Sequence, residues 1–130
     1  MEFAAPVPIL RMFDEQKARE FYLDYLEFKI IFEHRFEPGT PLYMGISRDG
    51  CVLHLSAHHG DCAPGAAVRI EVGELDEFHA QLRSKPYIYA RPGIERTPWG
   101  TREMKIVDPS FNRVIFVDAR SRRASPGDAA

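Results

Sequence analysis

The sequence predicts an α+β fold of two βαβββ modules, whose curved mixed sheets form a ligand cleft. Two segments have helical periodicity, and strand patterns surround each of them. The order of one strand, one helix and three strands also occurs twice, at an offset of about 60 residues, although the copies share few identical residues. A helix between groups of strands covers one face of a sheet and leaves the other face bare. Two bare faces opposite one another would make the cleft.

Two helices are predicted. Asp14 is a suitable N-cap for the first helix, and the second helix is predicted over residues 74–84. The apolar positions that recur at spacings of three and four are Ala18, Phe21, Tyr22 and Tyr25 in the first helix, and Leu75, Phe78, His79 and Leu82 in the second. We interpret His79 as a partly buried core histidine rather than a ligand.

Strand patterns surround the helices, and Asp49-Gly50 is a strong signal for a two-residue hairpin turn between two of them. The predicted strands are Val7–Met12, Phe28–Phe36, Leu42–Arg48, Cys51–Ala57, Ala67–Val72, Tyr87–Glu95, Arg102–Val107 and Arg113–Val117. We expect one domain over residues 1–119, with modules at about residues 6–60 and 66–118. Residues 120–130 are expected to be a flexible C-terminal tail.

Composition and charge exclude several classes of protein. The formal net charge is −2 and no basic stripe precedes the C-terminal end, so we expect no nucleic-acid partner. No apolar stretch approaches the roughly 20 residues that span a bilayer, so we expect no membrane partner. The N-terminus lacks the features of a signal peptide. Cys51 and Cys62 are interpreted as reduced thiols, and the expected location is the cytoplasm.

Two stretches of the chain carry a family resemblance. They are "PVPIL" through "FDEQKAREFYLDYLEFKI", an opening strand and helix, and "PWGTREMKIVDPSFNRVIFV", a closing hairpin in which "PWG", "DP" and "N" hold the family's spacing. Over about residues 6–118 the chain resembles the vicinal oxygen chelate superfamily of glyoxalases, bleomycin resistance proteins and dioxygenases. It resembles the bleomycin resistance proteins most. That superfamily hosts both enzymes and pure binders, so the resemblance implies the fold more strongly than the function.

The resemblance also implies where a metal would be held. The superfamily's enzymes bind a divalent metal through four strand positions, which here are Val7, His54, Ala67 and Ile115. Three of these side chains have no lone pair, so we expect no metal at those positions and no cofactor. The histidines do leave one alternative open. A relocated metal site is considered for His34, His54, His58, His59 and Glu103.

Five residues are candidates for ligand binding, and none is assigned a catalytic role. They are Trp99, His54, Tyr43, Glu103 and Phe36. The resemblance implies that Trp99 stacks on a planar part of the drug, although a tryptophan in a loop could equally plug the core. Strand alternation places His54, Glu103 and Lys105 on bare sheet faces. Carboxylates that could attract a cationic drug are Glu33, Glu37, Asp61, Glu95 and Glu103.

The resemblance implies non-catalytic binding and sequestration of a bleomycin-type glycopeptide antibiotic, which would confer resistance. The alternatives are a metal-dependent lyase or dioxygenase of the same superfamily, and a binder of another small molecule. No nucleophile motif or phosphate-binding loop is present. The family forms dimers, so we expect a homodimer, with Pro8 where the N-terminal strand crosses between subunits.

Overall fold

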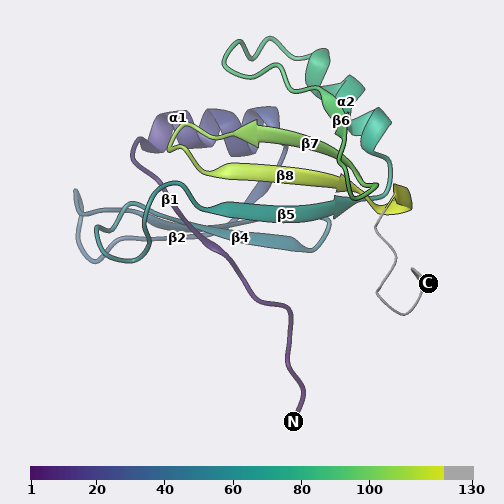
Figure 1. Ribbon diagram of the computed structural model, residues 1–130. Coiled ribbons are helices and arrows are strands. Elements are labelled where there is room, and N and C mark those ends of the chain that lie inside the picture. The colour runs from purple at the N-terminus through teal and green to yellow at the C-terminus, as the bar shows by residue number, and fades with distance from the viewer. Residues whose placement is uncertain (122–130) are drawn as a thin grey trace. The chain divides into compact units, whose positions relative to one another are not determined.

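The structure is a computed structural model that describes residues 1–121 of the chain, and it confirms the α+β prediction. Two curved, four-stranded mixed sheets are present in these residues, and each has the predicted order of one strand, one helix and three strands (Figure 1). The chain forms two compact units. The first unit comprises Met1–Ala66 and Asp108–Asn112, and the second comprises Ala67–Val107 and the described residues from Arg113 to Ser121.

The first unit contains a sheet with strand order β1-β4-β3-β2, in which β1 runs parallel to β4 and the other pairs are antiparallel. Its elements are β1 (Ile9–Arg11), helix α1 (Glu15–Arg19), which continues as the π-helical segment η1 (Glu20–Tyr25), β2 (Lys29–His34), β3 (Tyr43–Arg48) and β4 (Cys51–Ser56). In Figure 1 the residues before β1 run as an extended purple segment.

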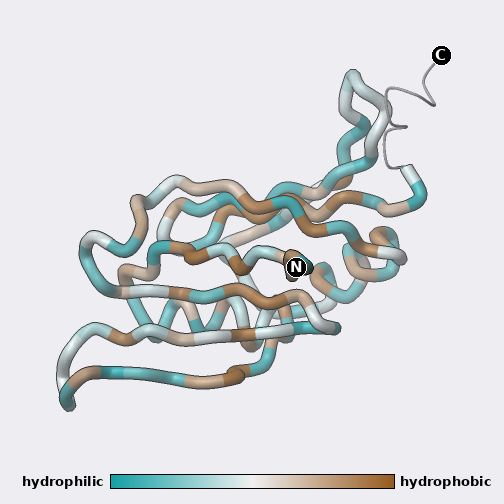
Figure 2. Tube along the Cα trace, turned by 90° about the horizontal axis from the view of Figure 1, so that it is seen from below, coloured by the Kyte–Doolittle hydropathy of each residue, from teal (hydrophilic) through white to brown (hydrophobic). Residues whose placement is uncertain are grey.

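The helix of the first unit forms for the reasons read from the sequence. The Asp14 side chain accepts a hydrogen bond from the backbone N–H of Lys17 at 2.9 Å, as an N-cap does. All four predicted apolar helix positions are at most 3 % exposed. They share the core with strand residues that alternate along β3 and β4, namely Met44, Ile46, Leu53 and Leu55. Figure 2 shows how short apolar stretches alternate with polar ones along the chain.

A turn from late in the sequence completes the core of the first unit. The buried Asp108 carboxylate accepts hydrogen bonds from the Tyr22 hydroxyl at 2.6 Å and from the Asn112 side chain at 2.9 Å. It also accepts from the backbone N–H groups of Ser110 and Asn112. Burial and the Asp108 carboxylate raise the pKa of Tyr22 well above its usual value, so its hydroxyl stays protonated. In the "DP" and "N" of the closing hairpin, Asp108 and Asn112 therefore stabilise the turn.

The second unit repeats the topology, with strand order β5-β8-β7-β6 and a parallel β5–β8 pair. Its elements are β5 (Ala67–Val72), α2 (Leu75–Arg83), β6 (Ile94–Arg96), β7 (Arg102–Val107), β8 (Arg113–Asp118) and the 3-10 turn η2 (Ala119–Ser121). Phe78 of α2 packs edge-to-face against Phe116 of β8, with ring centroids 4.9 Å apart. Met104 and Ile106 lie in the core.

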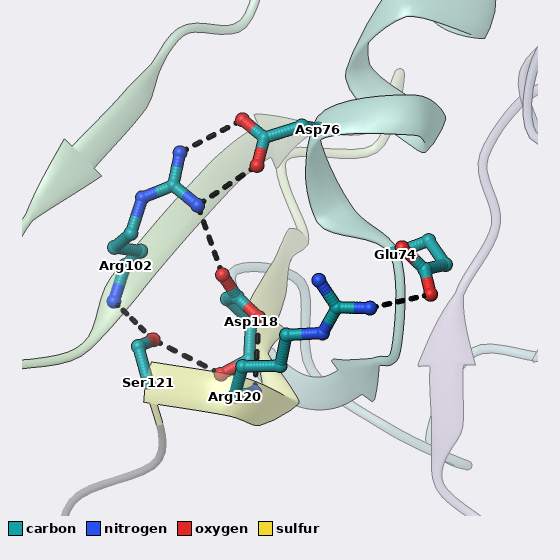
Figure 3. Close-up of polar contacts among 6 residues, drawn as sticks. All are labelled: Glu74, Asp76, Arg102, Asp118, Arg120 and Ser121. Atoms are coloured by element: carbon teal, nitrogen blue, oxygen red, sulfur yellow. Dashed lines mark hydrogen bonds and ion pairs between the residues drawn. The ribbon is translucent and has the colours of Figure 1, made fainter.

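Charged groups fasten α2 to the end of its sheet. Arg102 donates to both carboxylate oxygens of Asp76, at 2.8 and 3.0 Å, and to Asp118 at 2.9 Å (Figure 3). Arg120 donates to Glu74 at 2.8 Å, and the backbone N–H of Arg102 donates to the Ser121 hydroxyl at 2.7 Å. Arg120 and Ser121, which we expected in the tail, thus belong to this cluster. Residues 122–130 of the expected tail lie outside the described residues.

One strand prediction was largely wrong. The structure has a strand only over β6, Ile94–Arg96, where the sequence predicted Tyr87–Glu95. Pro92 has no backbone N–H to give to a sheet, and it is followed by Gly93, which weakens a strand. The segment is held differently, because His79 forms a hydrogen bond to the Pro92 carbonyl at 3.0 Å. Among the described residues, no helix has the length and apolar character needed to cross a membrane.

Candidate functional site

The first unit presents aromatic rings on the face of its sheet that points away from the helix, here called the open face. Strand register aligns Ile9, His54, Gly45 and Phe32 across the four strands. The next line across the sheet contains Arg11, Ser56, Tyr43 and His34. Since directly opposed residues point to the same face, these side chains share the open face. Two of the predicted ligand-binding residues, His54 and Tyr43, therefore lie together.

Phe32 completes an aromatic platform, defined here as the rings of Phe32, Tyr43 and His54. The Phe32 and Tyr43 rings are nearly parallel, at 13° and 6.1 Å between centroids. His54 meets both rings edge-to-face, at 5.2 Å from each. Phe32 is 39 % exposed, so its ring is accessible to a ligand. A planar molecule can stack on such a surface.

Gly45 allows the Phe32 ring to lie against the sheet. A Cβ atom added to Gly45 would stand 2.3 Å from Cε1 of Phe32, far inside any normal contact. A bulge in β2 between Ile30 and Phe32 also matters, because it turns Ile30 toward Ile46 and the helix side while Phe32 faces Gly45. Our sequence reasoning missed Phe32. The available signal was Gly45, because a glycine inside a predicted strand leaves room for a large side chain from the neighbouring strand.

A hydrogen bond joins two members of the platform. The Tyr43 hydroxyl and Nδ1 of His54 are 2.7 Å apart. Burial, followed by the nearby Asp61 carboxylate, raises the pKa of Tyr43, so the hydroxyl stays protonated at neutral pH and can donate to the imidazole. The pair thereby holds both rings in one orientation, which suits a preorganised surface.

Phe36 lies beside the platform rather than in it. Its ring is 77 % exposed and meets the rings of His34 at 5.1 Å and His58 at 5.8 Å. At the end of β4, the buried Ser56 hydroxyl donates to Asp61 at 2.6 Å and accepts from the His58 backbone N–H. Asp61 is therefore partly committed to its own loop.

The second unit brings together the other two predicted residues, Trp99 and Glu103. Arg69 of β5 donates to both oxygens of the Glu103 carboxylate, at 2.7 and 3.3 Å. The Thr101 hydroxyl donates to the same carboxylate at 2.7 Å, and Trp99 is close enough to contribute to lowering the pKa of Glu103. These donors, Arg69 foremost, hold the pKa of Glu103 below its usual value despite the opposing effect of burial.

Two of the carboxylates expected to attract a cationic drug have arginine partners instead. Glu103 is only 7 % exposed and pairs with Arg69, so its charge is compensated. Glu33 forms an ion pair with Arg19 of α1, because the β2 bulge leaves Glu33 on the helix side of the sheet. The expected negative field is therefore weaker than the sequence suggested.

The strand register identifies the neighbours of His54 and Ile115, two of the positions that the resemblance assigns to metal ligands. Ile9 lies directly beside His54, and Arg69 lies directly beside Ile115. Neither isoleucine nor a permanently protonated arginine can ligate a metal ion. Within residues 1–121, no group of three or more His, Cys, Asp or Glu side chains is arranged to hold a metal ion. Within the first unit, His34, His54, His58 and His59 therefore do not form such a group.

Comparisons with known proteins agree with the observed fold. A bleomycin-binding protein in complex with bleomycin is 25 % identical, with a TM-score of 0.66, and the match covers 89 % of this chain and 98 % of that one. A bleomycin resistance determinant encoded on the transposon Tn5 is also 25 % identical over the same shares of the chains, with a TM-score of 0.68. The bleomycin-binding protein of bleomycin-producing Streptomyces verticillus, in complex with copper(II)-bleomycin, is 28 % identical. For that structure the TM-score is 0.70, and the match covers 92 % of this chain and 98 % of that one.

The family assignment comes from the sequence itself. No curated protein sequence matches this chain significantly. A sequence model of a family described as glyoxalase superfamily protein, however, matches residues 1–122. That match covers nearly the whole chain and agrees with the resemblance of the opening helix and the closing hairpin. The chain therefore belongs to the glyoxalase superfamily.

Proposed function

We propose that this protein binds and sequesters a bleomycin-type glycopeptide antibiotic without turnover. The observation that carries the proposal is the aromatic platform, which holds the rings of Phe32, Tyr43 and His54 on an open sheet face. A surface of this kind favours a planar ligand. Structures of bleomycin-binding proteins at 25–28 % identity support this choice of ligand.

The proposal also covers the oligomeric state, the location and the metal content of the protein. It acts as a homodimer in the cytoplasm, with no resident metal, as a single domain over residues 1–119. A bare sheet face gains from being covered by a second copy, and closed two-fold symmetry is the commonest arrangement of soluble oligomers. Light scattering at micromolar concentration tests the dimer. A monomer at that concentration would contradict it.

Calorimetric titration with copper-free and copper-loaded bleomycin tests the function. The wild-type protein is expected to bind, and Phe32→Ala is expected to weaken binding about 5- to 150-fold, as stacked rings are worth roughly 1–3 kcal/mol. Tyr89→Ala is the matched control, because Tyr89 is an aromatic residue that is 76 % exposed and makes none of the platform contacts. A folded wild-type protein that releases no heat with either form would exclude bleomycin and leave another small molecule as the ligand.

Trp99 gives a second, optical test of the same ligand. It is the only tryptophan and is 50 % exposed, so its fluorescence reports on one site. Saturating bleomycin is expected to quench that fluorescence, and Trp99→Ala is expected to lower affinity about 5- to 150-fold without unfolding the protein. A flat titration under conditions where calorimetry detects binding would place the ligand away from Trp99. A variant that cannot fold would identify Trp99 as a structural plug.

Elemental analysis separates binding from the enzymatic alternative. We expect the purified protein to hold no stoichiometric divalent metal, because Val7, Ala67 and Ile115 stand at three of the four positions that the resemblance assigns to metal ligands, and none has a lone pair. One tightly bound metal per chain, whose removal by a chelator abolished turnover of a substrate, would favour a lyase or dioxygenase instead.

A further inference from the structure

We propose that the second sheet carries a binding site for an organic anion, in which Lys105 and Arg113 bind the anionic group. The site lies on the face of that sheet that points away from α2, which is its open face. The chemical class expected is a carboxylate, sulfonate or phosphate attached to an apolar skeleton. The inference goes beyond the proposed function and does not depend on it. Every residue involved belongs to the second unit.

The packing of α2 and the strand register decide which side chains lie on this open face. Phe116 of β8 packs against Phe78 of α2, so Ile115, the residue before it, points to the opposite face. In the strand register, Ile115 lies between Arg69 of β5 and Lys105 of β7. Because directly opposed residues point to the same face, two cationic side chains flank Ile115 on the open face.

The next line across the sheet adds a third cationic residue. Arg113 of β8 is aligned with Ala67 of β5 and Val107 of β7. It stands two positions from Ile115 on the same face of β8, and diagonally opposite Lys105. Diagonal neighbours in antiparallel strands are about 7–8 Å apart, and the side chains of Lys105 and Arg113 are both exposed. One anionic group can therefore contact both of these long side chains.

The cationic groups differ in whether a carboxylate neutralises them. Arg69 forms an ion pair with Glu103 at 2.7 Å. Among the described residues, by contrast, Lys105 and Arg113 take part in no ion pair. Their two positive charges are therefore available to a ligand.

The acidic residues of the open face are grouped on a different line across the sheet. That line contains Glu71, Val117, Glu103 and Glu95. Glu103 is only 7 % exposed, and its carboxylate already accepts two hydrogen bonds from Arg69. Within the described part of this unit, the lines through Ile115 and Arg113 contain no acidic residue. The charges are thus separated along the strands, and the end with Lys105 and Arg113 attracts an anion.

Apolar side chains lie between the cationic ones. Ile115 is 8 % exposed and is aligned with Lys105, whereas Val107 is 53 % exposed and is aligned with Arg113. A ligand that contacts the two cationic groups can also cover Val107, and removing that apolar surface from water favours binding. The arrangement therefore favours an anionic group with an apolar part over a free inorganic ion.

A pair of related dyes tests the site in the full-length protein by fluorescence titration. Anilinonaphthalene sulfonate carries a sulfonate on an apolar ring system, and phenylnaphthylamine has the same ring system without the sulfonate. The wild-type protein is expected to bind the sulfonate dye saturably at low ionic strength. That affinity should fall as sodium chloride is added, because salt screens exposed charges. The formal net charge of the whole chain is −2, so general attraction to the protein does not explain such binding.

The double variant Lys105→Met with Arg113→Met removes both cationic groups and keeps long side chains. Exposed ion pairs are weak, so the loss expected for two contacts is about 2- to 30-fold in affinity for the sulfonate dye. The affinity for the neutral dye should not change. The control is the double variant Arg91→Met with Arg96→Met, which removes two exposed arginines of the same unit. Arg96 is aligned with Arg102, on the other face of the sheet, so the control should bind both dyes as the wild type does.

The outcomes separate a local site from general effects. Circular dichroism checks folding, and if the double variant does not fold, the single variants Lys105→Met and Arg113→Met replace it, with losses of up to about 5-fold each. A folded variant with wild-type affinity for the sulfonate dye would overturn the proposal. Equal losses for the two dyes, an equal loss in the control, or no saturable binding of the sulfonate dye to the wild-type protein would also overturn it.

Discussion

The two sheets share a strand order but present opposite kinds of open face. The line across the first sheet through His54 consists of Ile9, His54, Gly45 and Phe32, with no permanently charged side chain. The corresponding line in the second sheet contains Arg69, Ile115 and Lys105. The faces toward the helices, by contrast, are alike, with Met44 and Ile46 on β3 matched by Met104 and Ile106 on β7.

The difference shows how one framework carries two chemistries. Alternate residues of a strand point to opposite faces, so the helix-facing set can be kept for packing while the other set changes. In the first unit that other set forms a stacking surface. In the second unit it forms the ion pair between Arg69 and Glu103. The comparison yields four predictions, given from the largest expected effect to the smallest.

The turn at Asp108–Asn112 should contribute more to the stability of the first unit than any exposed side chain does. Asp108→Ala removes a buried carboxylate that accepts four hydrogen bonds and leaves the Tyr22 hydroxyl buried without a partner. We expect a loss of about 3–5 kcal/mol in the free energy of unfolding, measured by urea denaturation. Tyr22→Phe, which removes one donor, should cost about 1–2 kcal/mol. Similar small losses for both variants would show that the turn is not essential to the first unit.

The second unit should lose stability with acid through its ion pair. Because the folded-state pKa of Glu103 is below the unfolded value of about 4.3, the contribution of Glu103 is complete above that pH and is lost as pH falls through the folded-state pKa. Glu103→Gln should therefore be less stable than the wild type at pH 7, by about 1–2 kcal/mol because Arg69 is half exposed. Urea denaturation between pH 7 and pH 3 should show that gap closing. A constant gap would mean that the pair does not titrate as described.

The aromatic platform should be easier to displace than to unfold. Gly45→Ala forces the Phe32 ring off the sheet, because the new Cβ would stand 2.3 Å from Cε1. The ring is partly exposed and can move, so we expect a loss of only about 1 kcal/mol in thermal unfolding, with a changed near-ultraviolet circular dichroism signal. Gly73→Ala is the control, since nothing lies within 4 Å of its added Cβ. An unchanged aromatic signal in Gly45→Ala would contradict the platform geometry.

The arginines on edge strands β1 and β5 differ in their partners. Arg69 on β5 has a carboxylate partner, whereas Arg11 on β1 stacks over the Phe13 ring at 4.9 Å, and its buried Nη1 meets no acceptor among the described residues. Removing an unsatisfied buried donor costs little, so Arg11→Met should change the free energy of unfolding by less than about 1 kcal/mol. Chemical denaturation measures this. A loss of several kcal/mol would contradict this prediction.

The sequence was sufficient for most of the elements and for part of the candidate site. Helical spacing located α1 and α2 closely, and alternation located β5 and β7 to the residue. Alternation assigned His54 to a bare sheet face, and the structure places Tyr43 beside it; Trp99 and Glu103 lie close together. The π-helical segment, the shortened β6 and the late turn in the first unit were not anticipated. Each depends on which distant residues pack against the segment, and local spacing carries no information about that.

By itself, the sequence determined the helices and most strands, because these follow from the spacing of apolar residues along the chain and from side-chain chemistry. Only the tertiary structure decided which residues meet. The bulge in β2 sends Phe32 to the open face, and strand register sets it over Gly45, thirteen positions away in the chain. Pairing of β5 and β7 with β8 brings Arg69 to Glu103, 34 positions away. Packing of η1 against the turn at Asp108 brings Tyr22 to a carboxylate 86 positions away. Pairing across strands depends on the alignment of whole segments, and a shift of one residue would reverse every face.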